Sequence, residues 1–262
     1  MKRKTERINE KKTSYINDII KRQLVFMQKY DFHIHSQYSK DSATPLKDIL
    51  RAAQNKELNG IAICDHDEVK GGLKAMEIVR SDPEKYGNLL VIPGTEVTTS
   101  KGHMLVLGVS EKIPPFMTPE ETADYARNLN ALSIIAHPYR KAAHGIGYIE
   151  GIGADAVETF NSKCLTNSAN NKARKEAERL NMPQVGGSDA HFEELIGQGY
   201  TLIDARENTQ ESVFEAIRAG KTTACGEKTP KTIVIGQIQK NIVRRTRSFF
   251  KKGNETETDE EE

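Results

Sequence analysis

From Tyr30 to about residue 225, amphipathic stretches with helical spacing alternate with short apolar runs. Amphipathic stretches with apolar residues at helical spacing predict helices at 44–57, 71–82, 119–130, 168–180 and 209–219. Between them, short apolar runs predict strands: "IAIC", "LLVIPG", "HMLVLGV", "ALSIIA", "AVETF", "QVGG" and "YTLID". This alternation is typical of an α/β protein with a parallel sheet. A closed (β/α) barrel would gather side chains at its strand ends.

Both ends of the chain follow other patterns. Ile16, Ile19, Ile20, Leu24 and Met27 predict an amphipathic helix over about 14–28 that packs on the main domain. Beyond residue 231, apolar residues at helical spacing run into the basic segment "KNIVRRTRSFFKK" and the acidic end "ETETDEEE". The sequence therefore divides into a basic arm and helix (1–29), a central domain (30–230), and a basic helix with an acidic disordered tail (231–262).

Composition favours one sizeable domain. The 262 residues are 37% hydrophobic, which is enough for one large core. Apolar runs fall short of the roughly 20 residues that span a bilayer, so we expect no transmembrane segment. The N-terminal sequence lacks the features of a secretory signal. The three cysteines are far apart in sequence and fit neither a disulfide framework nor a zinc finger, so we expect a reducing, cytoplasmic setting.

The net charge of +1 hides an uneven distribution. Residues 1–29 carry +6 and residues 231–262 carry +1, which leaves a net charge of −6 for the central domain. An acidic centre permits a cation-binding site. The basic C-terminal segment is interpreted as a docked helix, and the alternative is a surface for nucleic acid or anionic lipid.

Histidines and carboxylates recur at the predicted strand ends. Alternation along a strand would place Asp31, His33 and His35 of "DFHIHSQYSKD" on one face. The other histidine-bearing segments are "ICDHDEVKGG", "GTEVTTSKGH", "IIAHPYRKAAHG" and "VGGSDAH". Burying each group separately would cost desolvation, whereas a shared metal cluster removes that cost for all of them. Imidazole and carboxylate ligands without a nearby thiolate suit zinc, manganese or iron.

The ordered set HxH, DHD, GTE with GH, AHP and SDAH resembles the PHP (polymerase and histidinol phosphatase) family over about residues 30–225. The resemblance implies a distorted (β/α)7 TIM-like barrel, here with flanking N- and C-terminal helices, that holds two to three divalent ions. One ion would be bound by His33, His35, Glu96 and Asp189, a second by the bridging Glu96 with His103 and His137, and a third by Asp41, His66 and His191. Family members often have histidine at the position of Asp41, and aspartate is also a competent ligand.

The resemblance further implies hydrolysis of a phosphate ester by a metal-activated hydroxide. Arg140 and Lys163 are candidates for binding the anionic substrate, and His144 for orienting a phosphate or protonating the leaving oxygen. Asp31, Asp65 and Asp67 are interpreted as groups that orient the ligand histidines.

The sequence is compatible with several functions. The expected substrate is a small phosphorylated metabolite, a nucleotide or a nucleic-acid end. Histidinol phosphate is an alternative substrate, as is RNA or DNA cleaved by a 5'-3' exonuclease-type phosphodiesterase. Nucleic acid could bind through the C-terminal basic segment. A degenerate barrel that serves as a binding scaffold is the alternative outside the enzymes.

Overall fold

The computed structural model describes residues 27–164, 166–230 and 233. Its centre is one nine-stranded sheet with the order β7-β6-β5-β4-β3-β2-β1-β8-β9. The strands are β1 (Gln28–Ile34), β2 (Gly60–His66), β3 (Leu90–Thr98), β4 (His103–Leu107), β5 (Leu132–Ile135), β6 (Ala156–Asn161), β7 (Gln184–Gly187), β8 (Gly199–Ile203) and β9 (Thr222–Gly226).

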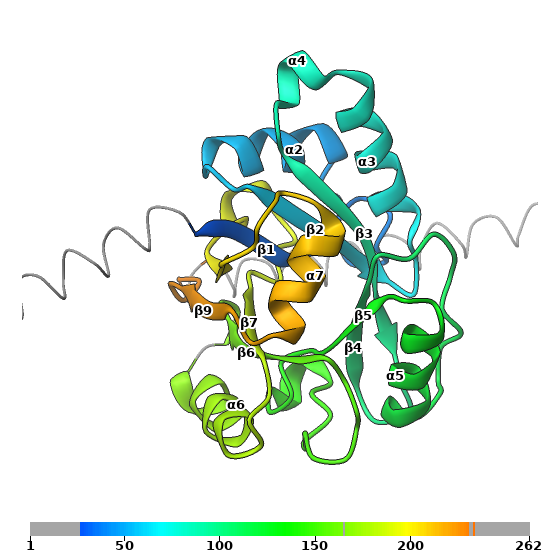
Figure 1. The fold of residues 1–262 in the computed structure, drawn as a ribbon, viewed down its shortest axis with the longest axis vertical. Coiled ribbons are helices and arrows are strands. Elements are labelled where there is room, and N and C mark those ends of the chain that lie inside the picture. Colours follow the sequence, from blue (N-terminus) through cyan, green and yellow to red (C-terminus); the bar gives the residue numbers. More distant parts are fainter. Residues whose placement is uncertain (1–26, 165, 231–232, 234–262) are drawn as a thin grey trace, which may run out of the picture.

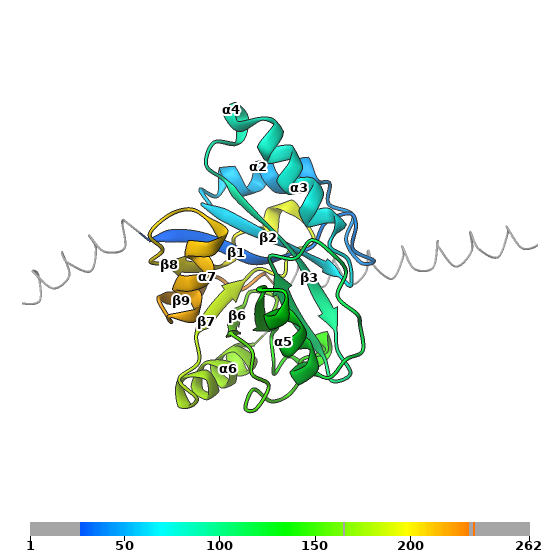
Figure 2. The same cartoon turned by 45° about the vertical axis from the view of Figure 1, so that its right-hand side comes forward.

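Helices flank this sheet (Figures 1 and 2). The helices α2, α3 and α4 gather beside β1, β2 and β3, whereas α5 packs on β4 and β5 and α6 on β6. Their bounds are α2 (Leu46–Asn55), α3 (Lys70–Ser81), α4 (Pro83–Tyr86), α5 (Pro119–Asn128), α6 (Asn167–Arg179) and α7 (Gln210–Arg218), with short 3-10 helices η1 (Lys141–Ala143) and η2 (Glu193–Leu195). Within the described ranges, helices long and apolar enough to cross a membrane are absent.

The α/β class is confirmed, but the sheet is mixed and not the parallel sheet of a regular (β/α)7 barrel. Strand β4 is antiparallel to both β3 and β5, and β8 and β9 are antiparallel to their neighbours. The reason lies in the connection from Thr98 to His103, because a parallel crossover needs a dozen or more residues and this turn has only four. Strand β9 and the short helix α4 were absent from the prediction.

The predicted helix at 14–28 lies almost wholly outside the described residues, as does the predicted helix and tail at 231–262. Two residues of the predicted helix can be compared: Met27 is neither helix nor strand, and Gln28 begins strand β1, so the prediction is wrong there. Gln28 instead pairs with Ile203 of the antiparallel strand β8.

The two arms of the sheet curl toward each other and nearly close a barrel. Ile34, at the end of β1, forms a parallel bridge with Ala190, which follows β7. Strand β7 is also joined to β8, since Gly186 N donates to Thr201 Oγ1 at 2.8 Å. A Cβ atom on Gly199 would lie 2.0 Å from Gly187 O, so this close approach of β7 and β8 requires glycine. The closure brings the ends of β1 and β7 together.

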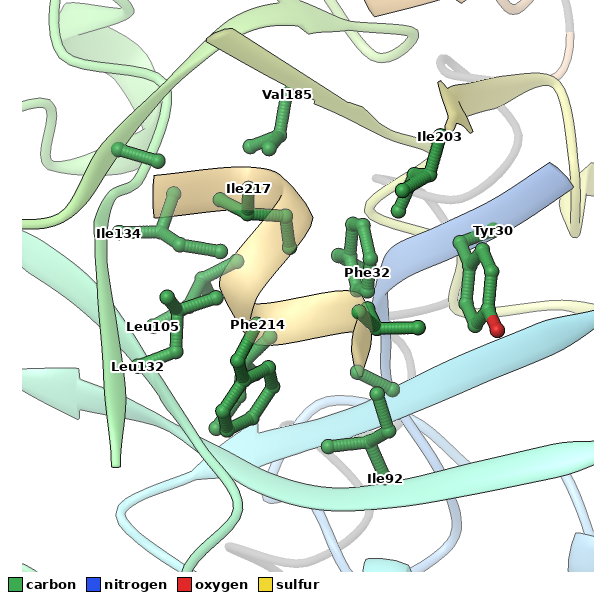
Figure 3. Close-up of a cluster of buried hydrophobic side chains, with 14 of the residues drawn as sticks. Tyr30, Phe32, Ile92, Leu105, Leu132, Ile134, Val185, Ile203, Phe214 and Ile217 are labelled. Carbon is green, nitrogen blue, oxygen red and sulfur yellow. The ribbon is translucent and has the colours of Figure 1, made fainter. Parts of the chain in front are cut away.

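The barrel interior is filled by apolar side chains from most strands and from α7 (Figure 3). Phe214 and Ile217 of α7 point into the same cluster as Phe32 and Leu105. Burying each such side chain contributes about 1.5–3 kcal/mol to folding. A second cluster, with Ile49 of α2 in it, packs outside β1, β2 and β3. These two apolar layers fix the strands on which the polar site is built.

Candidate metal centre

Glu96 of β3 lies at the centre of a cluster of histidines and is only 1% exposed. Its Oε1 atom lies 2.9 Å from His103 Nδ1 and 3.1 Å from His137 Nε2. The other oxygen, Oε2, lies 3.2 Å, 3.3 Å and 3.4 Å from the ring nitrogens of His35, His66 and His33. One carboxylate thus contacts five imidazoles, as a bridging ligand would.

The strand ends explain this convergence. His33 and His35 lie at the end of β1, and His66 is the last residue of β2. His137 follows β5. His103 is the first residue of β4 and not the last residue of a strand. Because β4 is antiparallel to β3, His103 pairs with Thr98 at the end of β3. All of these residues therefore reach the same edge of the sheet.

A second group lies around Asp41, in the loop after β1. Its Oδ2 atom is 2.8 Å from His191 Nε2 and 3.3 Å from His66 Nε2. Burial opposes ionisation of Asp41, but hydrogen bonds from His191 and His66 outweigh it and hold the pKa of Asp41 far below its usual value. With His35, these residues offer donor atoms within 4.8 Å of one another.

Asp189 lies between His35 and two basic side chains, Arg140 and Lys163. Its Oδ1 atom lies 3.6 Å from His35 Nε2 and 3.0 Å from Lys163 Nζ, and its Oδ2 atom lies 2.7 Å from Arg140 Nη1. Lys163 Nζ also lies 3.0 Å from His191 Nδ1. The two predicted substrate-binding cations therefore do lie at the site, but both are paired with a predicted metal ligand.

Glu158 of β6 is a site residue that the sequence analysis missed. Its Oε1 atom is 3.0 Å from His33 Nδ1, while Oε2 accepts hydrogen bonds from His137 N at 2.8 Å and Asn161 Nδ2 at 3.1 Å. The side chain is 1% exposed. The available signal was an acidic residue inside the apolar strand "AVETF", since a carboxylate there must have buried partners.

The nitrogen atoms of the cluster test whether a cation fits. Five buried ring nitrogens make no well-directed hydrogen bond among the described residues: His33 Nε2, His35 Nε2, His66 Nδ1, His103 Nδ1 and His137 Nδ1. All but His137 Nδ1 nevertheless lie within 3.4 Å of a Glu96 oxygen. Leaving such an atom unsatisfied costs about 1–3 kcal/mol. A divalent ion accepts these lone pairs, and four overlapping groups of three or four donors surround the space. The residues present fit divalent metal ions.

The protonation of His35 and Glu96 agrees with that fit. Burial, with help from neighbouring His191, lowers the pKa of His35 to about 3, so this imidazole is neutral and able to donate a lone pair. Burial would raise the pKa of Glu96, but the neighbouring His66, His33 and His103 outweigh it and hold that pKa well below its usual value. Glu96 is therefore a carboxylate at neutral pH. At His33 and His66, burial would lower the pKa, but the surrounding carboxylates outweigh it and raise the pKa of both rings, so a metal ion would displace a proton there.

A cavity of about 580 Å³ opens on the cluster. Glu96, His103 and His191 line it, together with Arg140 and Lys163. His144 is exposed at the cavity, where its ring lies 5.3 Å from the ring of His103. Most of the residues expected at the site thus line this cavity. The other two, His33 and His35, contact Glu96, which lines it.

Among the described residues, the three flanking aspartates make no hydrogen bond to a histidine ring, so the prediction that they orient the ligand rings is wrong. Of the described histidines, only His33 donates to one of them, through its backbone N to Asp31 at 3.2 Å. Asp31 accepts hydrogen bonds from Ser188 N and Gly197 N, both at 2.9 Å, because β1 shifts register just after it and turns it toward the β7 loop. Asp65 accepts from Ser36 N at 2.6 Å, and Asp67 from Thr98 N at 2.7 Å. These carboxylates fix the backbone of loops that carry the ligands.

Histidines and carboxylates gathered at one edge of a curled α/β sheet define a metal-binding barrel protein. A family model described as PHP-associated matches residues 167–222. Together with the ordered histidine and carboxylate motifs, this match shows that the chain belongs to the PHP family. Two uncharacterized proteins of Methanocaldococcus jannaschii are similar in sequence. One is 32% identical over 163 residues, covering 56% of this chain and 92% of the relative, and the other is 31% identical over 180 residues, covering 66% and 69%.

Solved structures share the fold. A two-domain protein from Bacteroides vulgatus that contains a predicted PHP-like metal-dependent phosphoesterase has a TM-score of 0.59 and 22% identity, covering 77% of this chain and 65% of that one. PsfC from Pseudomonas syringae has a TM-score of 0.60 and 19% identity, covering 84% and 98%. The lesion-specific endonuclease Q of Pyrococcus furiosus has a TM-score of 0.55 and 18% identity, covering 76% and 57%. This chain thus spans less than two thirds of the first and third.

Proposed function

We propose that the protein is a metal-dependent phosphoesterase. The observation that carries this proposal is the carboxylate of Glu96, which contacts five imidazoles and lines a cavity. Divalent ions in such a site supply hydroxide near neutral pH and neutralise the charge of phosphoryl oxygens. Membership of the PHP family and the fold shared with a PHP-like phosphoesterase support the same reaction class.

The chain's own residues would hold two to three ions. His33, His35 and Asp189 form one group of converging donors, with Glu96 beside them. Glu96 and His103 contribute to a second, for which His137 lies 3.1 Å from the same carboxylate. Asp41, His66 and His191 belong to a third. Manganese, zinc and iron all suit these donors.

Basic groups at the cavity would bind the substrate. Arg140 and Lys163 both line the cavity and are paired with Asp189. An anionic substrate group that enters the cavity would replace Asp189 as the partner of one of these cations. The exposed ring of His144 lies where it could orient a phosphate or donate a proton to the leaving oxygen.

We further propose a small phosphorylated metabolite, a nucleotide or a nucleic-acid end as substrate. The cavity of about 580 Å³ has room for a small organic phosphate. Endonuclease Q, with a TM-score of 0.50 to this chain, was crystallised with a duplex carrying an abasic lesion at its active site, which favours the nucleic-acid branch. Histidinol phosphate is an alternative substrate. Exonucleolytic cleavage of RNA or DNA is an alternative reaction.

Turnover of a phosphoester panel tests the proposal. The full chain with Mn²⁺ or Zn²⁺ is expected to hydrolyse at least one of 4-nitrophenyl phosphate, bis(4-nitrophenyl) phosphate, a nucleoside bisphosphate or a 5'-phosphorylated oligonucleotide. Chelation should reduce the rate at least about a hundredfold, because the ions supply several kcal/mol of transition-state stabilisation. Release of phosphate or nitrophenol measures the rate.

Two results would redirect the proposal. Turnover of histidinol phosphate alone would replace the preferred substrate class. A protein that retains less than about one ion per chain after purification in metal-supplemented buffer, and hydrolyses none of these esters, would favour the scaffold role.

A further inference from the structure

Helix α3 packs directly against the loop that leaves β1 for the metal centre. A Cβ atom on Gly71 would lie 2.0 Å from Asp65 Oδ2 and 2.5 Å from Ser36 Oγ, so only glycine permits this approach. Ser36 directly follows His35 in the chain. The first two turns of α3 are therefore held beside the site.

Two lysines of α3 point toward an aromatic ring of the same loop. The ammonium of Lys70 lies 5.7 Å from the ring centre of Tyr38, and that of Lys74 lies 5.4 Å from it. These distances are those of cation–π contacts. Together with Lys40, these residues form what we call the Tyr38 surface: Tyr38, Lys40, Lys70 and Lys74. All three lysines are exposed.

Nearby acids leave this surface with positive charge. Lys70 and Lys74 stand four residues apart on one helix, where like charges repel. Asp67 lies 4.0 Å from Lys40, and the carboxylate of Glu68 is 2.7 Å from Lys112. Glu68 accepts a hydrogen bond from the backbone N of Lys70 at 3.2 Å, but among the described residues no carboxylate lies within 4.0 Å of the ammonium of Lys70 or of Lys74. An anionic partner would relieve the repulsion between them.

The Tyr38 surface is continuous with the cavity. Lys40 lines the cavity that opens on Glu96, and Tyr38 lies two residues earlier in the same loop. Cations therefore extend from Lys40 in the cavity lining to Lys70 and Lys74 in the first turns of α3. A flat bilayer could not follow this path into a concave site, whereas a flexible polyanion could.

We propose that the Tyr38 surface binds the phosphate backbone of a single-stranded nucleic acid whose end enters the cavity. This inference rests on the proposed phosphoesterase function and adds the substrate class to it. The lysines supply backbone attraction that is independent of sequence, as such surfaces do in proteins that bind single strands.

Charge reversal on α3 tests the inference. The full chain with Lys70→Glu and Lys74→Glu is compared with wild type and with Lys85→Glu, a matched control on α4 where Lys85 lies over Tyr86. The probe is a fluorescein-labelled single-stranded DNA 20-mer, measured by anisotropy between 50 and 200 mM salt. Loss of two phosphate contacts should weaken binding by about tenfold or more and reduce the salt slope by about 1.4. Turnover of bis(4-nitrophenyl) phosphate should stay at the wild-type rate.

The outcomes separate this inference from the function on which it rests. Weakened DNA binding with unchanged turnover of the small ester supports the Tyr38 surface, and unchanged turnover also shows that the variant folds. Wild-type DNA affinity in the double variant overturns the inference and leaves the phosphoesterase proposal intact. The inference is also overturned if phosphatidylserine vesicles bind in place of DNA, or if only Arg244→Glu with Arg245→Glu in the C-terminal segment abolishes DNA binding.

Discussion

Replacing Glu96 with glutamine is expected to lower kcat by at least about a thousandfold. The substitution keeps the size of the side chain but removes the negative charge that contacts five imidazoles. Loss of a bridging ligand disturbs two ions, whose combined stabilisation of the transition state is several kcal/mol, and about 4 kcal/mol corresponds to a thousandfold. Metal-dependent turnover of a chromogenic phosphoester measures the effect.

Asp41→Asn is the matched comparison for Glu96→Gln. Asp41 contacts two histidines of the predicted third site, His66 and His191, and accepts a hydrogen bond from Ser39 Oγ, so its loss should reduce kcat far less than loss of the bridge. Metal content measured on the same samples should fall further in the Glu96 variant. Comparable activity and comparable metal content in the two variants would contradict a bridging role for Glu96.

Glu158→Gln is expected to reduce metal affinity or kcat about 10–100-fold, the usual effect of removing the partner that orients a ligand histidine. Glu158 accepts at His33 Nδ1, which leaves Nε2 of that ring facing Glu96. Depending on its orientation, a glutamine would also place its amide NH2 either against the N–H donors of both His137 and Asn161 or against His33 Nδ1.

Competition with a fluorescent chelator measures the affinity of the Glu158 variant for Mn²⁺ and Zn²⁺. Glu77→Gln on the exposed side of α3 serves as the control and should bind metal as wild type does. If Glu158→Gln keeps wild-type affinity and wild-type kcat, Glu158 does not position His33.

The histidines of the site were predictable because they follow a pattern that packing alone does not produce. Most of the seven histidines come just after apolar runs, and a buried imidazole needs a partner. His103 belonged to the same pattern although it begins a strand, since an antiparallel strand places its first residue at the edge where its neighbours end. Asp41, which lies in a loop, was assigned through the resemblance to the PHP family.

Direction and register were less predictable. An apolar run has the same appearance in a parallel and an antiparallel strand, so only the four-residue turn between Thr98 and His103 distinguishes the two cases. Glu158 was missed because a lone acid in a strand carries no motif. Asp31 was misjudged because the strand shifts register immediately after it, which the alternation rule cannot anticipate.

Anomalous diffraction from crystals of the full chain grown with Mn²⁺ tests the central claim most directly. We expect at least two manganese peaks, each within about 2.5 Å of imidazole or carboxylate donors, with Glu96 coordinating two of them. Peaks confined to other parts of the molecule, or an empty cluster beside occupied surface sites, would contradict the account.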